Sequence, residues 1–133
     1  MRHLVLPLVL ATAIAGCSHP VETLAGELNG RAYSVRLHND GPVTLASVRV
    51  TTGQDVPPLT IASLAPGATS GAAEVPILHE HPIVAATVNG RAALYQPVEG
   101  FAGFNAQVAP GSYVIRMRWV PEYQLVDTRV VRE

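Results

Sequence analysis

The sequence predicts an all-β fold, a single antiparallel β-sandwich, from three observations. Eleven glycines and eleven prolines divide the 133 residues into short apolar segments. Asn-Gly, a strong signal for a two-residue hairpin turn, occurs at Asn29-Gly30 and again at Asn89-Gly90. After the first seventeen residues, no stretch keeps a 3.6-residue apolar stripe between capping residues, so the pattern does not favour helices.

The first segment has the features of an export signal. Arg2 supplies a positive charge, and residues 4–14 form an apolar run broken only by Pro7 and Thr12. That run is too short to cross a bilayer, which takes about 20 helical residues. A basic start, a short apolar run and small residues at the end are typical of a cleaved signal.

The end of this signal resembles the lipobox of bacterial lipoproteins, in Ile14-Ala15-Gly16-Cys17. The resemblance implies that residues 1–16 are removed and that Cys17, the single cysteine, carries acyl chains such as palmitate. Residues 17–23 would then be a short membrane tether before the domain at 24–133. Ser18, where an aspartate favours inner-membrane retention, implies an outer-membrane anchor facing the periplasm. The alternative is an ordinary secretory signal with a chance cysteine.

The first strands follow from alternation and turn residues. Residues 24–28 form a short apolar segment that ends at the first Asn-Gly. Residues 31–38 alternate, with Tyr33, Val35 and Leu37 on one face, which predicts a half-buried strand.

The next strand, residues 43–51, changes parity. Val43 and Leu45 fall on one face, whereas Val48 and Val50 fall on the other. A regular strand cannot bury both pairs on one side, so we expect a β-bulge near Ala46-Ser47.

After a loop, Leu59 and Ile61 predict a short strand. The turns on either side of this part of the chain, with the strand between them, resemble those of a bacterial immunoglobulin-like module of the CARDB type. The matching elements are the Asn-x-Gly turn, the valine-rich strand and the Leu-x-Pro-Gly turn: Leu37-His38-Asn39-Asp40-Gly41, Val48-Arg49-Val50 and Leu64-Ala65-Pro66-Gly67. The resemblance covers about residues 31–75 and implies an immunoglobulin-like sandwich. Such modules are adapters of many kinds, so it implies little about function.

The second half of the chain supplies the remaining strands. Residues 72–78 predict an edge strand because Pro76 cannot donate a ladder hydrogen bond. Residues 83–88 and 91–96 flank the second Asn-Gly as a hairpin. Tyr113 starts a strand that runs to Trp119, and its position after Pro-Gly resembles the tyrosine corner of β-sandwiches. Residues 123–131 close the domain.

The candidate metal ligands are His79 and His81. Residues i and i+2 of an extended segment share a face, so both imidazoles could point at one ion. A zinc site needs three or four ligands, and only two are evident, so the favoured interpretation is a solvated turn and no cofactor is expected.

Candidate contact residues lie in the longest irregular segment, residues 97–107. It holds Phe101 and Phe104, the only phenylalanines. They could form an exposed binding loop, or they could fold back over the open end of the sandwich. A second candidate surface is formed by arginines of the last two strands, namely Arg116, Arg118, Arg129 and Arg132, where interleaved acids favour cross-strand pairing.

Several function classes find no support in the sequence. The formal net charge of −1 does not favour nucleic acid as a partner. There is no Gly-x-Ser-x-Gly, no lysine for a phosphate loop, and no recognisable spacing among the carboxylates. We therefore expect a non-enzymatic, lipid-anchored envelope adapter that contacts another envelope protein. A small-ligand or metal-binding periplasmic lipoprotein is the alternative, and an enzyme is the third class.

Overall fold

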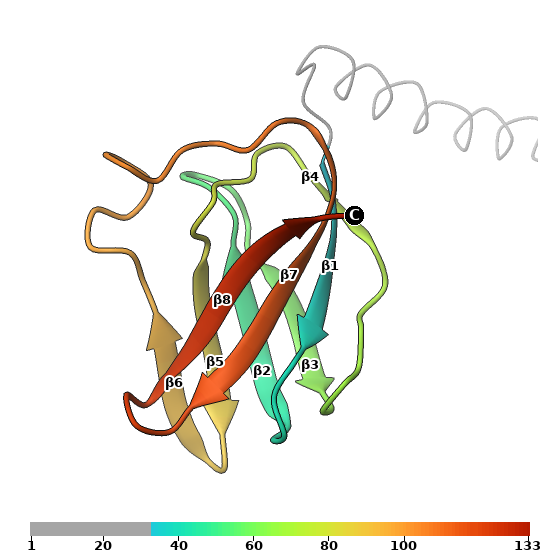
Figure 1. Cartoon of the computed structure of the whole chain (residues 1–133), viewed down its shortest axis with the longest axis vertical. Coiled ribbons are helices and arrows are strands. Elements are labelled where there is room, and N and C mark those ends of the chain that lie inside the picture. Colours follow the sequence, from blue (N-terminus) through green and yellow to red (C-terminus); the bar gives the residue numbers. More distant parts are fainter. Residues whose placement is uncertain (1–32) are drawn as a thin grey trace, which may run out of the picture. The chain divides into compact units, whose positions relative to one another are not determined.

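The computed structural model describes residues 33–133, which form two β-sheets packed face to face (Figure 1). The expected signal, Cys17, the tether, the strand at 24–28 and the first Asn-Gly turn lie outside the described residues. No helix occurs within residues 33–133, and hence none there that could span a membrane.

Each sheet has four strands. The first sheet has the order β4-β1-β7-β8, with β1 (Tyr33–Asn39), β4 (Ala73–Val75), β7 (Gly111–Val120) and β8 (Leu125–Arg132). The second has the order β3-β2-β5-β6, with β2 (Leu45–Thr51), β3 (Leu59–Leu64), β5 (Ile83–Val88) and β6 (Arg91–Tyr95). The predicted all-β sandwich is therefore confirmed.

One strand pair departs from the expected antiparallel arrangement. β1 runs parallel to β7, from Tyr33 opposite Gly111 to Asn39 opposite Met117, whereas every other pair of neighbouring strands is antiparallel. A tight hairpin forces its two strands to be antiparallel. β1 and β7 are joined by most of the domain, so no turn sets their relative direction.

The predicted bulge lies where the parity changes. The register of β2 against β5 shifts between Ala46 and Arg49, and Ser47 adopts a positive φ of 47°. The extra residue turns Val48 to the same side as Leu45, and both are fully buried. The core can therefore use both halves of this strand.

The edge strand at 72–78 is shorter than predicted. β4 covers only Ala73–Val75, because Pro76 cannot donate to the ladder.

The β5–β6 hairpin has the expected turn, with Asn89 and Gly90 at φ values of 51° and 79°.

The predicted tyrosine corner is present at the start of β7. The Tyr113 hydroxyl donates a hydrogen bond to the carbonyl oxygen of Ala109 at 2.5 Å. It accepts a second from Nη1 of Arg132 at 3.0 Å, and this guanidinium also lies over the Tyr113 ring, 5.5 Å from its centroid. Arg132 is thus part of the corner and does not share the outer surface with Arg129.

Candidate functional site

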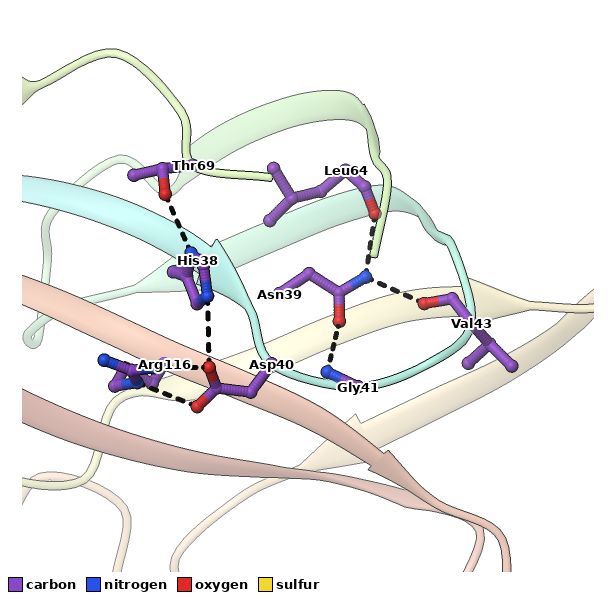
Figure 2. A network of polar contacts seen from close by, with 8 residues as sticks. All are labelled: His38, Asn39, Asp40, Gly41, Val43, Leu64, Thr69 and Arg116. Carbon is purple, nitrogen blue, oxygen red and sulfur yellow. Dashed lines mark hydrogen bonds and ion pairs between the residues drawn. The ribbon is translucent and has the colours of Figure 1, made fainter. Parts of the chain in front are cut away.

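The turn after β1 is held from inside by the side chain of Asn39, which is fully buried. Its Nδ2 donates to the carbonyl oxygens of Val43 at 2.7 Å and Leu64 at 2.9 Å, and its Oδ1 accepts from the Gly41 amide at 3.0 Å (Figure 2). These bonds join the Asn-x-Gly turn to the end of β3, where the Leu-x-Pro-Gly turn begins. The motif residues behind the sequence resemblance therefore have a structural role.

A polar network continues from this turn onto the outer surface. Both carboxylate oxygens of Asp40 accept hydrogen bonds from Arg116, at 2.7 and 2.8 Å, and His38 Nε2 lies 3.1 Å from Oδ1 (Figure 2). The hydrogen bonds from Arg116 hold the pKa of Asp40 below its usual value of 3.8. The other ring nitrogen of His38 lies 2.7 Å from Thr69 Oγ1.

The order carboxylate, imidazole, hydroxyl in this network also occurs in hydrolase triads. Here Asp40 is committed to a bidentate ion pair with Arg116, whereas a triad carboxylate serves to orient the imidazole. The network joins β1 to β7 and to the segment before β4. The network therefore holds these strands together at the surface. We call its members, His38, Asp40, Thr69 and Arg116, the surface clasp.

The arginine-bearing surface beside this clasp is mixed in charge. Arg116 lies directly opposite Arg129, and Arg118 lies opposite Asp127. With Asp40 these residues line a polar hollow of about 450 Å³. Arg118 and Arg129 form no ion pair within residues 33–133, so the expected cross-strand pairing is present as register but not as direct salt bridges.

The two candidate metal ligands, His79 and His81, form hydrogen bonds to Asn105 of the neighbouring loop. His79 is buried, and its Nδ1 lies 2.6 Å from the carbonyl oxygen of Asn105, to which it donates. His81 is exposed, and its backbone amide and carbonyl both bond to the Asn105 side chain, each at 2.9 Å. Within residues 33–133, no three histidine, cysteine or acidic side chains form a group that could hold a metal ion.

The loop at residues 97–107 is fixed through Asn105, which is 6% exposed. Its Nδ2 donates to the Gly100 carbonyl at 2.7 Å as well as to His81. The Glu80 amide donates to the Ala106 carbonyl at 2.9 Å, so residues 80 and 81 hold the end of the loop through backbone as well as side-chain bonds. The long loop therefore has a defined shape.

The two phenylalanines of this loop have different surroundings. Phe101 is half-buried and packs on the His79 ring, with centroids 4.9 Å apart. Phe104 is 94% exposed, and Val98 is exposed as fully. The two rings therefore differ, because Phe101 packs inward and Phe104 points to solvent.

Val98 and Phe104 border a hollow of about 340 Å³ that includes Pro97, Ala102 and Asn105. We call Val98 and Phe104 the apolar tip. The sequence pattern did not predict Val98 or Asn105 as part of this loop's surface or support. Val98 could have been noticed as an apolar residue outside any alternating strand, but a single asparagine in an irregular segment carries no pattern.

Comparison with known proteins supports the fold alone. No protein-family model and no curated protein matches the sequence. Among solved structures, the chain is similar to the NMR structure of a protein from Eubacterium rectale, with a TM-score of 0.53 and 12% identity. The match covers 77% of this chain and 91% of that one. At this identity, the similarity shows a shared β-sandwich fold and carries no function across.

Proposed function

We propose that this protein is a lipid-anchored envelope lipoprotein that acts without catalysis, by holding another envelope protein through the apolar tip. The observation that supports the proposal most is the exposure of Phe104 on a loop whose backbone is fixed. Isolated exposed apolar residues are common on protein surfaces. Here, two lie on one loop, border one hollow, and are held by a buried asparagine.

A fixed loop is suited to binding for an energetic reason. Ordering a flexible loop on association costs conformational entropy, and a loop already held in shape avoids much of that cost. Aromatic side chains are favoured anchors at interfaces because one ring buries a large area. Phe104 meets both conditions, so it is the residue we expect to contribute most to the contact.

The proposed anchor is Cys17, carrying acyl chains such as palmitate. Two or more chains give membrane attachment that does not readily reverse. Ser18 supports an outer-membrane location facing the periplasm, and the Asn-x-Gly and Leu-x-Pro-Gly turns support an immunoglobulin-like module of the CARDB type. The near-neutral charge supports a protein rather than a nucleic acid as the second partner.

The anchor is tested with Cys17→Ser in the full-length chain. We expect loss of acylation, measured by mass spectrometry and by incorporation of labelled palmitate. The variant should be unprocessed or should leave the membrane fraction. Mature variant protein that still fractionates with membranes would contradict the lipoprotein proposal.

The contact is tested with Phe104→Ser, followed by cross-linking and co-purification from the native envelope. We expect loss of one co-purifying protein without a change in melting temperature. Leu94→Ser is the matched control, because Leu94 is also an exposed apolar residue but belongs to β6 and not to the loop. Equal recovery of the same proteins by wild type and Phe104→Ser would refute the contact.

A further inference from the structure

The polar hollow on the outer face of β7 and β8 contains charges that the domain itself leaves unpaired. Three arginines and two aspartates line this hollow of about 450 Å³. Asp40 is engaged in the bidentate ion pair with Arg116. Within residues 33–133, the side chains of Arg118, Arg129 and Asp127 form no hydrogen bond or ion pair. The hollow therefore offers two free guanidinium groups and one free carboxylate.

Strand register concentrates the positive charge of this hollow. Arg129 lies directly opposite Arg116, and Arg118 follows Arg116 by two residues, so all three arginines belong to one face of the sheet. Like charges directly opposite each other destabilise a strand pair. The pKa of Asp40 is held low by the hydrogen bonds from Arg116, with a smaller contribution from the charge of Arg129, which places this second guanidinium near the surface clasp. An anion bound between these arginines offsets their repulsion.

Two of the three arginines are held in place before any ligand binds. A Cβ atom on Gly41 would come within 2.9 Å of Cγ of Arg118, so the stem of this arginine packs against the turn after β1. Buried Asn39 fixes that turn. Arg116 uses two of its five N–H donors on Asp40, and the ion pair orients its guanidinium (Figure 2). A site that is ordered in advance loses less conformational entropy on binding.

We propose that this hollow binds a phosphate group that carries a neighbouring ammonium group, as in phosphoethanolamine. Arg118 and Arg129 donate hydrogen bonds to the phosphate oxygens, because a planar guanidinium matches two oxygens of one phosphate. The free carboxylate of Asp127 accepts hydrogen bonds from the ammonium group. Arg116 remains bound to Asp40 and adds positive charge beside the phosphate.

The balance of charges favours this ligand over simpler ions. An inorganic phosphate would leave Asp127 as an unpaired negative charge beside the bound anion, and the two would repel each other. A cation alone would face the excess of arginines. A ligand that carries both charges provides a partner for all three free side chains. The inference does not depend on the acylation of Cys17 or on the apolar tip.

The test is a phosphorus NMR titration of the full-length chain, purified in a nonionic detergent, with O-phosphoethanolamine and with inorganic phosphate. We expect saturable binding of one O-phosphoethanolamine per chain, tighter than the binding of inorganic phosphate. Arg118→Gln and Arg129→Gln should each weaken this binding by about tenfold, because each removes charge-assisted hydrogen bonds to the phosphate. Asp127→Asn should abolish the preference for O-phosphoethanolamine, since the carboxylate that selects the ammonium group is gone.

Arg49→Gln is the matched control, because Arg49 is an exposed arginine on β2, in the other sheet, and its loss should leave binding unchanged. Arg129→Gln should not lower the melting temperature of the free protein, since it removes the charge opposite Arg116. Lost binding in that variant is then not lost folding. The proposal would be overturned by the absence of saturable binding, by equal losses in Arg49→Gln and Arg129→Gln, or by a preference that persists in Asp127→Asn.

Phosphate with a neighbouring ammonium group occurs in soluble esters and in lipid headgroups, and a second titration distinguishes the two sources. Mixed micelles of the same detergent with phosphatidylethanolamine present the headgroup on a lipid. Tighter binding to these micelles than to O-phosphoethanolamine would identify a membrane lipid as the ligand, and weaker binding would identify a soluble ester. Micelle binding must also fall in Arg118→Gln; tight micelle binding that this variant retains would contradict the assignment of the hollow.

Discussion

Two buried asparagines hold two loops of this domain, and the loops differ in what they present to solvent. Asn39 and Asn105 each make three side-chain hydrogen bonds to backbone groups. Around Asn39 the bonds join a short turn to the end of β3. Around Asn105 they shape a long loop that carries Phe104 in the open.

The same feature, a buried asparagine side chain bonded to backbone groups, has a different consequence in each loop. A buried amide with all its bonds made is favourable, but it is costly when a partner is removed. The bonds of Asn39 make its turn rigid and connect the two sheets. The bonds of Asn105 instead fix a loop that presents the apolar tip, which is why we propose that loop, and not the turn, as the binding site.

The largest effect is expected for Asn39→Ala. The change leaves the Val43 and Leu64 carbonyls and the Gly41 amide without their partner in a buried site. We expect the free energy of unfolding to fall by about 3 kcal/mol, measured by urea denaturation. A loss below about 1 kcal/mol would show that water replaces the amide and that this turn is not the stronger connection.

A smaller loss of stability is expected for Asn105→Ala, about 1–2 kcal/mol, because the released loop can open to water without separating the sheets. Hydrogen exchange should accelerate at the amides of Gly100, His81 and Ala106 but not in β1 or β7. Co-purification of the proposed partner should fall as it does for Phe104→Ser. If exchange instead accelerates throughout the domain, the two asparagines have the same role.

The smallest effect is expected at the surface clasp beside Asn39. The hydrogen bonds from Arg116 lower the pKa of Asp40 in the folded protein. The stability that Asp40 contributes is therefore present above about pH 3.8, and it is lost as pH falls through the lower pKa of the folded state. Asp40→Asn should cost at most about 1 kcal/mol near neutral pH, because the pair is partly exposed. Thermal melts should show that difference shrinking below pH 4; a constant difference would mean that Asp40 acts without its charge.

Local patterns determined much of the fold. The Asn89-Gly90 turn, the bulge at Ala46-Ser47 and the Tyr113 corner each depend on residues only a few positions apart, which is why the sequence was enough to predict them. The Arg116–Arg129 opposition could not be derived that way, since it needs the register of two strands. The export signal and Cys17 were identified from the sequence too, and they remain predictions.

The sequence by itself thus determined the all-β class, the β5–β6 hairpin and the tyrosine corner. Only the tertiary structure decided that β1 runs parallel to β7, that Asn39 bonds to Leu64, and that Phe101 packs on His79 while Phe104 stays exposed. The reason is the range of the interactions. A turn or a bulge is set by the φ and ψ preferences of adjacent residues, whereas the burial of a loop side chain depends on which distant segment packs beside it.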